Sequence, residues 1–330
     1  MIYDCFIFFN ELDLLEIRLN TLNEVVDKFV LVESDKTHTG ETKELLFEKN
    51  KQRFEKFLDK IIHIKVQDCP DIQSVSADSY GNRWLLENFQ RDSIMKGLVT
   101  AKNEDIIIIS DLDEIPNPKI IKEYKDNSVQ GIWVLHQKMM YYFLNNLCIT
   151  NPVWDNGTRL GRYSDLLEPQ QDFKTKGAHE FTKKGLPTYF RFCKGKIIKN
   201  GGWHFSYCGG VEAIIAKRKS ISEQQYNTEK NMDPSFIKKM IKGGKDILGR
   251  RQFKYLPTKI DSNFPEYIVK NQDKYSHLVF QLSEEYLRYK KISLAFEIFF
   301  ERLFSVFIEP SYVKFNILGL KLTFNKRSKK

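Results

Sequence analysis

The amino-acid sequence predicts an α/β protein with a mostly parallel central sheet, followed by C-terminal helices and a short basic tail. Strand-like and helix-like segments alternate from residue 2 to residue 110. One strand is the isoleucine run 106–109, whose β-branched side chains suit a strand that is buried on both faces. Two carboxylates follow this run directly, and open α/β sheets bind their ligands beyond the carboxyl ends of the strands.

The first half of the chain supplies the regular alternation. Strands are predicted at residues 2–9, 29–32, 61–66 and 106–110. Apolar residues at helical spacing predict helices between them, at residues 12–26, 50–60 and 84–98. This order favours parallel strands joined by crossover helices.

The second half is predicted to be less regular. Further strands are expected at residues 131–135, 139–143, 188–192 and 195–199, with loop-rich stretches at residues 150–162 and 165–185. Helices are expected at residues 212–219, 234–242, 267–271 and 283–307. Residues 313–317 and 320–324 alternate apolar and polar side chains around Leu318-Gly319, which predicts a small hairpin. We therefore expect a main domain at 1–282, an amphipathic helix at 283–309 and a basic amphipathic tail at 310–330.

Composition and charge narrow the class of protein. A hydrophobic content of 42% is typical of a globular chain, and no apolar run is long enough to span a membrane. The five cysteines are scattered without a CxxC pair, so we expect no zinc site and a reducing, cytoplasmic environment. Of the net charge of +9, much lies between Val313 and Lys330, which hold six Lys or Arg and no acid. This distribution argues against nucleic acid as a partner and favours a local contact with an anionic membrane surface.

The acids after the isoleucine run are the first candidate site. Asp111 and Asp113 are two residues apart, so they lie on the same side of an extended chain. Two hard oxygen ligands suit Mg²⁺ or Mn²⁺ that also holds a diphosphate. The alternative is a pair of solvated acids in a turn after the strand.

His204 is the second candidate. It follows Trp203 and two glycines that would allow a close backbone approach to a ligand. With the two aspartates it would form a mixed nitrogen and oxygen site suited to Mn²⁺. The alternative is a core histidine bonded to the backbone.

Other charged residues each allow a functional and a structural interpretation. Glu212 opens a predicted helix, where it would either act as a general base or interact with the helix dipole. Lys217 would neutralise phosphate or belong to a solvated face. Glu33 and Asp35 end a strand, and would bond a ribose or base, or cap the turn. Arg91, on the helix before the isoleucine strand, has an exposed ion pair as its simplest explanation.

Taken together, these motifs resemble glycosyltransferase family 17. The resemblance runs in order from about residue 2 to residue 280. It rests on Asp111-Leu112-Asp113-Glu114-Ile115-Pro116, Gly202-Trp203-His204-Phe205-Ser206, Tyr3-Asp4-Cys5-Phe6, the segment from Phe29 to Ser34 and the segment from Pro265 to Asn271. It implies a GT-A type nucleotide-sugar-binding fold in which an aspartate pair, through a divalent metal, holds the donor diphosphate.

The resemblance also implies an activity. We expect a metal-dependent inverting glycosyltransferase that moves a sugar, N-acetylglucosamine in the first place, from a nucleotide-sugar donor such as a UDP-sugar to a glycan acceptor. The expected metal ligands are Asp111, Asp113 and His204, and the expected catalytic residues are Glu212 and Asp113. The donor would contact Glu33, Asp35, Arg91, Asp111 and Lys217.

The basic tail resembles those of bacterial cell-envelope glycosyltransferases. A bacterial surface polysaccharide or lipid-linked glycan is therefore the expected acceptor, and the inner face of the plasma membrane is the expected place of work.

Three alternatives stay open. Asp165, Glu168 or Glu180 would replace Glu212 as the base if the predicted loops reach the site. A haloacid-dehalogenase-type phosphatase also places two aspartates after an apolar strand, but its motif needs Thr or Val where this chain has Ile115. A non-catalytic protein that binds sugar nucleotides would keep the same residues without turnover.

Overall fold

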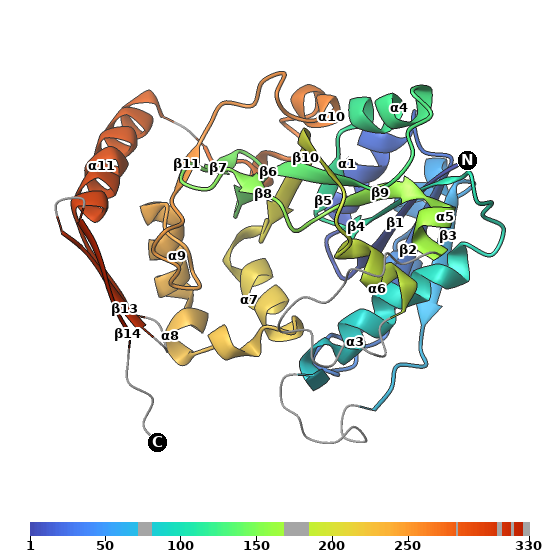
Figure 1. The fold of residues 1–330 in the computed structure, drawn as a ribbon, viewed down its shortest axis with the longest axis horizontal. Coiled ribbons are helices and arrows are strands. Elements are labelled where there is room, and N and C mark those ends of the chain that lie inside the picture. Colours follow the sequence, from blue (N-terminus) through green and yellow to red (C-terminus); the bar gives the residue numbers. More distant parts are fainter. Residues whose placement is uncertain (72–80, 168–184, 282, 309–311, 318–319, 326–330) are drawn as a thin grey trace. The chain divides into compact units, whose positions relative to one another are not determined.

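The computed structural model of the chain describes residues 1–71, 81–167, 185–281, 283–308, 312–317 and 320–325. Its contacts divide the chain into two compact units, Met1–Phe280 and Gln281–Lys330. The first unit is an α/β domain built on one large mixed sheet, and the second is a helix with a small antiparallel sheet (Figure 1).

The centre of the first unit is a parallel sheet in the order β3-β2-β1-β4. The strands are β1 (Ile2–Phe8), β2 (Lys28–Ser34), β3 (Ile61–Val66) and β4 (Ile106–Asp111). All four predicted strands of the first half are thereby confirmed. The connections contain α1 (Leu12–Leu22), α2 (Leu46–Lys49), the 3₁₀ helix η1 (Lys51–Phe57), α3 (Gly81–Asp92) and the 3₁₀ helix η3 (Ser93–Gly97). The helix predicted at residues 50–60 is thus mainly of the 3₁₀ kind.

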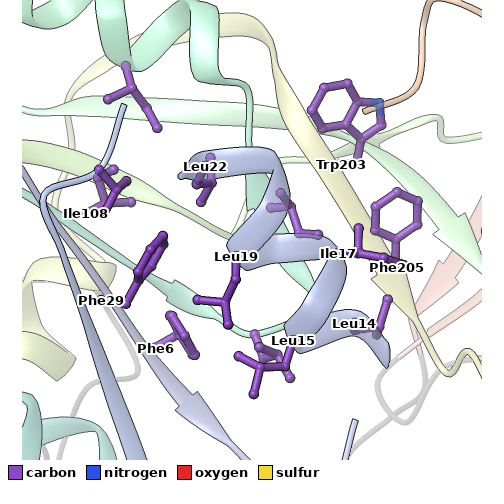
Figure 2. Close-up of a cluster of buried hydrophobic side chains, with 14 of the residues drawn as sticks. Phe6, Leu14, Leu15, Ile17, Leu19, Leu22, Phe29, Ile108, Trp203 and Phe205 are labelled. Atoms are coloured by element: carbon purple, nitrogen blue, oxygen red, sulfur yellow. The ribbon is translucent and has the colours of Figure 1, made fainter. Parts of the chain in front are cut away.

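Strand β4 is buried on both faces, as its isoleucines predict. Ile106 and Ile108 pack into the core beneath α1, whereas Ile107 and Ile109 pack into a separate core on the opposite face. Figure 2 shows the first of these cores, where the apolar side of α1 faces Phe6, Phe29 and Ile108 on one flank. Trp203 and Phe205 close the other flank (Figure 2), so a strand from the second half of the chain completes the core of the first.

Beyond β4 the sheet becomes mixed. Strand β9 (Arg159–Arg162) lies antiparallel between β4 and β6 (Trp133–Tyr141), and β7 (Asn146–Cys148), β8 (Val153–Trp154) and β11 (Tyr255–Pro257) extend this side. Strand β10 (Lys196–Ser206) runs parallel to β6 and antiparallel to the short β5 (Glu114–Pro116). The two strands predicted at residues 131–143 are therefore one strand, and the strand predicted at residues 195–199 is the start of a longer one.

The strand predicted at residues 188–192 is wrong, because residues 186–191 form helix α6 (Leu186–Arg191). Pro187 sits in the first turn, where its fixed φ suits a helix start. The Asp92 carboxylate accepts hydrogen bonds from the backbone N–H groups of Gly185 and Thr188, both at 2.8 Å. A cap supplied from 93 residues away cannot be read from the local pattern.

The described part of the first unit contains further helices besides α6. They are α4 (Pro118–Asp126), α5 (Tyr163–Leu167), α7 (Gly210–Ser220), η5 (Gln224–Tyr226), α8 (Glu229–Met232), α9 (Pro234–Gly243), α10 (Glu266–Lys270) and η6 (Ser276–Leu278). The helices predicted at residues 212–219, 234–242 and 267–271 are confirmed by α7, α9 and α10. Most of the loop predicted at residues 165–185 lies outside the described residues.

The second unit holds α11 (Glu284–Leu303) and the strands β12 (Phe304–Ile308), β13 (Tyr312–Ile317) and β14 (Leu320–Asn325). The predicted hairpin is confirmed, because β13 and β14 pair antiparallel. The long predicted helix ends earlier than expected, at Leu303, because residues 304–308 pair with β13 as a strand. None of the helices in the described part of the chain is both long and apolar enough to cross a membrane.

Candidate active site

The candidate site lies at the point of the parallel sheet where the order of successive strands reverses. The chain passes from β1 to β2 and β3 on one side, and β4 pairs with β1 on the other. The carboxyl ends of β1 and β4 therefore face a switch point, the usual ligand position in such sheets. Glu11 follows β1, and Asp111 and Asp113 follow β4. Lys217 of α7 joins the two ends, with its Nζ at 3.2 Å from Glu11 Oε1 and 2.8 Å from Asp113 Oδ2.

Arg18 holds the backbone of residues 110–114, which we call the acidic turn. Its side chain is fully buried and forms a two-pronged ion pair with Asp4, at 2.8 Å and 2.6 Å. The same guanidinium donates to the Ser110 hydroxyl at 2.6 Å. It also donates to three backbone carbonyls of the turn, those of Asp111 at 3.0 Å, Leu112 at 3.1 Å and Glu114 at 2.9 Å. One buried cation thus holds residues 110–114 in a single conformation.

Two guanidinium groups hold the Asp111 carboxylate. Arg91 of α3 donates to Oδ1 at 2.9 Å, and Arg191 of α6 donates to Oδ2 at 2.8 Å. Burial alone would raise the pKa of Asp111, but the charges of Arg191 and Arg91 outweigh burial and hold that pKa well below its usual range. Asp111 is therefore ionised at any physiological pH.

The two arginines are themselves part of a longer chain of charges. Arg191 donates to both oxygens of the buried Glu114, each at 2.7 Å, and Trp154 Nε1 donates to the same carboxylate at 2.7 Å. Arg91 also donates to Glu87 at 2.9 Å. Bidentate contacts of this kind fix geometry as well as charge, so the Asp111 carboxylate is held in place from α3 and α6.

His204 lies beside Asp113, but the two are not hydrogen-bonded. The separation from His204 Nε2 to Asp113 Oδ1 is 3.6 Å, beyond hydrogen-bond range. The imidazole ring lies 4.5 Å from the Trp154 ring. Its other nitrogen, Nδ1, is buried and has no hydrogen-bond partner among the described residues. The unpartnered nitrogen is therefore not the one that faces Asp113, and a buried polar atom of this kind calls for a partner such as a water or a ligand.

The glycines before Trp203 explain how His204 reaches the acidic turn. Strand β10 is squeezed between β5 and β6, and its register places His204 opposite Glu114. Gly202 has φ of +145°, and a Cβ there would collide with the backbone oxygen of Ile115. A Cβ on Gly201 would lie 2.7 Å from the Leu135 Cβ. Only glycine permits both approaches, so this motif serves the placement of the site.

The site carries an excess of negative charge. Five carboxylates (Glu11, Glu87, Asp111, Asp113 and Glu114) lie in contact with three cations (Arg91, Arg191 and Lys217). Burial raises the pKa of Glu11, but Lys217 more than compensates and leaves it below its usual value. Arg91, with help from His38, does the same for Glu87. Every one of these carboxylates contacts a cation, but the eight groups together carry a net charge of −2, which a bound divalent cation would balance.

The donor atoms for such a cation are fewer than predicted. No group of three or more His, Cys, Asp or Glu residues in the described part of the chain is arranged as a complete metal site. Asp113 Oδ1 and His204 Nε2, however, are separated by a distance that two ligands of one Mg²⁺ or Mn²⁺ can adopt. Asp111 keeps lone pairs on oxygens that each accept one guanidinium bond. Asp113 and His204 are therefore the two predicted ligands whose donor atoms lie close together, and a metal role for Asp111 stays a prediction.

Three of the predicted residues lie away from this cluster. Glu33 is buried, accepts the backbone N–H of Phe47 at 2.8 Å and contacts His63 at 3.1 Å, so it supports local structure. Asp35 lies next to Lys43 through a backbone bond of 2.7 Å, and its Oδ1 has no hydrogen-bond partner within the described ranges. Glu212 is exposed on the first turn of α7. It precedes Lys217 by five residues, which places it about 140° around the helix from the lysine.

The sequence predicts no role in the site for several residues that the structure places there. They are Glu11, Arg18, Glu87, Glu114, Trp154 and Arg191. A signal existed for two of them. Glu11 follows a parallel strand as the aspartates do, and Glu87 stands one helical turn before Arg91. Arg191 lies in a segment that was predicted to be a strand, so its contact with Asp111 could not be predicted.

The fold and the site define a class: an α/β protein with a charged ligand site at the switch point of a parallel sheet. Within that class, residues 1–159 match the family model of Glycosyltransferase family 17, so the resemblance expected from the motifs is confirmed. The matched part contains the acidic turn, Arg18 and Arg91. It does not contain Arg191, His204 or Lys217.

Curated relatives extend the match over more of the chain. The beta-1,4-mannosyl-glycoprotein 4-beta-N-acetylglucosaminyltransferase of Homo sapiens is 25% identical over 293 residues, and that of Rattus norvegicus is 24% identical over 293 residues. Each alignment covers 82% of this chain and 53% of the relative. The chain thus spans about half the length of the curated relatives it matches.

Solved structures give weaker likenesses. The 2-C-methyl-D-erythritol 4-phosphate cytidylyltransferase of Francisella tularensis has a TM-score of 0.28 at 13% identity, covering 50% of this chain and 74% of that one. HddC from Yersinia pseudotuberculosis has a TM-score of 0.33 at 8% identity, covering 68% of this chain and 98% of that one.

Proposed function

We propose that this chain is a glycosyltransferase that moves a sugar, N-acetylglucosamine in the first place, from a nucleotide-sugar donor to a glycan acceptor. The match of residues 1–159 to family 17 and the names of the curated relatives support the reaction class. The observation that carries the proposal is the acidic turn after β4, held at the switch point by Arg18 and flanked by three cations.

The cations are suited to a diphosphate. Arg91, Arg191 and Lys217 converge on Asp111 and Asp113, so an anionic donor group entering the site would meet guanidinium and ammonium groups at once. Each is buried or nearly so, and low local dielectric strengthens its interaction with phosphate oxygens. In this proposal the donor contacts are Arg91, Arg191 and Lys217, with Asp35 and Glu33 as further predicted contacts.

A divalent metal belongs to the proposal. Asp111, Asp113 and His204 would hold Mn²⁺ or Mg²⁺, which when bound would offset the charge that develops on the leaving diphosphate. The net charge of −2 among the charged groups of the site and the 3.6 Å separation of His204 Nε2 from Asp113 Oδ1 support this assignment. Trp154 packs against His204 and bonds Glu114, so it orients the imidazole toward Asp113.

The acceptor hydroxyl needs a base. Glu212 remains our predicted base, although it lies about 140° around α7 from Lys217, so it can act only on an acceptor that binds over the first turn of α7. Among the alternatives, Asp165 is engaged in accepting the Arg162 backbone N–H at 2.8 Å. Glu168 and Glu180 lie outside the described residues. Glu212→Gln is expected to lower transfer about a hundredfold while leaving donor affinity within about twofold of the wild type.

The acceptor and the setting complete the proposal. We assign the chain to the synthesis of a bacterial surface polysaccharide or a lipid-linked glycan, in the cytoplasm at the inner face of the membrane. All five cysteines are free thiols, which supports a reducing compartment.

The test is turnover of a nucleotide-sugar panel by the purified chain, with and without Mn²⁺ or Mg²⁺. A glycosyltransferase shows slow metal-dependent hydrolysis of one donor, and transfer when an acceptor is added. Asp113→Asn should abolish both, whereas Asp59→Asn, an exposed aspartate outside the site, should change neither. Release of phosphate from monoesters would instead indicate a phosphatase. Donor binding without turnover in any condition would indicate a non-catalytic protein.

A further inference from the structure

Helix α11 presents a continuous apolar stripe to solvent. Seven of the thirteen large hydrophobic residues that are exposed in the described part of the chain lie in the second unit. Five of them are on α11: Tyr289 is 72% exposed, Ile292 53%, Phe296 61%, Phe299 56% and Phe300 54%. We call these five residues the α11 stripe. Their spacing of three or four residues places them on one side of the helix.

The α11 stripe is not the packed side of the helix. Leu294 is 1% exposed and Lys290 8%, and these two mark the face turned toward protein. At 100° per residue, the stripe is centred roughly 150° around the helix from that face. The helix also contacts β12 and β13 (Figure 1), so its need for a packing partner within the second unit is already met.

The stripe is a joined surface of rings. Phe296 and Phe300 are stacked with centroids 6.4 Å apart, and Phe299 meets Phe300 edge-on at 5.8 Å. An exposed apolar patch of this size on a soluble surface usually marks a contact site. Leu320 and Leu322 of β14, exposed by 69% and 48%, add apolar surface to the same unit.

The net charge of the second unit indicates which kind of partner the α11 stripe would bind. Residues 281–330 contain ten Lys or Arg against five Glu and no Asp, so they supply a net +5 of the chain's +9. A second copy of this unit would bring two groups of like charge together, which opposes self-association. An anionic surface that is apolar beneath its charges satisfies both the stripe and the cations.

We propose that the α11 stripe docks the protein on an anionic lipid bilayer, with the helix lying along the surface. The five apolar side chains enter the boundary between headgroups and acyl chains, and the net positive charge of residues 281–330 attracts the unit to the lipid phosphates. The sequence predicts that residues 310–330 contact the membrane, and we now assign that contact mainly to α11. This inference assigns a surface to the membrane location that the proposed function includes, whereas a failure of glycosyl transfer itself would leave the vesicle result unchanged.

The test is co-sedimentation of the full chain with vesicles of phosphatidylcholine alone or mixed with phosphatidylglycerol. Wild-type protein is expected to bind the anionic vesicles at least about tenfold more tightly than the neutral ones, and about 0.5 M salt should weaken that binding. Phe296→Ser/Phe300→Ser should weaken binding to anionic vesicles by about tenfold or more. The matched control is Val99→Ser/Ile197→Ser, which removes similar exposed apolar groups from the first unit, where they are 81% and 58% exposed.

Three results would overturn the proposal. The first is wild-type protein that ignores both kinds of vesicle at low salt. The second is a Phe296→Ser/Phe300→Ser variant that binds as the wild type does, or a control variant that loses as much. The third is a wild-type dimer in light scattering that the stripe variant converts to a monomer, which would assign the stripe to a second copy of the chain. Circular dichroism of both variants checks that α11 remains folded.

Discussion

Replacing Arg18 with methionine tests how the acidic turn is held. The substitution keeps much of the apolar stem that packs on the Phe6 ring but removes the guanidinium. Asp4, which is 0% exposed, would then keep a charge with no cation beside it. Breaking a buried ion pair in this way costs about 3–5 kcal/mol. The carbonyls of Asp111, Leu112 and Glu114 would also lose their donor.

The expected result is a large fall in stability and a looser turn. For a domain of this size about 1 kcal/mol corresponds to about 2 °C, so the unfolding midpoint should fall by about 6–10 °C. Nucleotide-sugar binding should weaken as well, because Asp111 and Asp113 lose their fixed backbone. Differential scanning calorimetry and titration calorimetry measure the two effects separately.

A double variant separates the two contributions of Arg18. Asp4→Leu/Arg18→Met removes both charges, so it should recover the part of the loss that comes from the unpaired Asp4. The unsatisfied carbonyls should still cost about 1–3 kcal/mol. Arg53→Met is the matched control, because Arg53 pairs with Asp13 and Glu16 at the surface and should cost at most about 1 kcal/mol.

The reasoning fails if Arg18→Met unfolds within about 1 kcal/mol of the wild type. It also fails in part if the double variant recovers stability fully, because the carbonyl contacts would then contribute nothing.

Three further predictions concern the site. Gly202→Ala should cost at least about 2 kcal/mol from its positive φ and its clash with the Ile115 carbonyl, whereas Gly131→Ala, also at positive φ but with open space around it, isolates the conformational part in thermal melts. His204→Ala should weaken Mn²⁺ binding about tenfold in calorimetry with a smaller change in stability, and a collapse of the melting point with unaltered metal affinity would assign it to the core. The Lys217 charge outweighs burial and lowers the pKa of Glu11 in the folded protein. The pair should therefore stabilise the fold fully above about pH 5, and this stabilisation should be lost as the pH falls toward the pKa of Glu11 in the folded state. Thermal melts of Lys217→Met at acid pH should lack this dependence.

The parallel half of the fold was predictable from sequence because its determinants are local. The β-branched run 106–109 and the period of α1 each report burial within a single segment. The helix α6 was not predictable, because Asp92, a residue distant in the chain, caps its first turn. Segments whose conformation depends on a remote partner give no local signal.

The candidate site was predictable to a similar extent. Asp111, Asp113 and His204 stand out because unusual residues surround them in sequence, and the structure places His204 beside Asp113. Lys217 pairs with Glu11 and Asp113, and its predicted contact with phosphate stays a prediction. The counter-ions were harder to find: Arg18 and Arg191 lie on ordinary amphipathic or ambiguous segments, and their importance depends on where their long side chains end.

The pairing of β10 with β5 and β6 has a consequence for dissecting the protein. A fragment that stops at residue 159, where the family match ends, would keep the acidic turn but lose Arg191, His204 and Lys217. It would also lose Trp203 and Phe205 from the core beneath α1. Such a fragment would hold all five carboxylates of the site (Glu11, Glu87, Asp111, Asp113 and Glu114) but only Arg91 of their three cations, beside an incomplete core. We therefore expect that residues 1–159 do not fold as a separate module, and that a shortened chain must extend through α7 to keep the charged site complete.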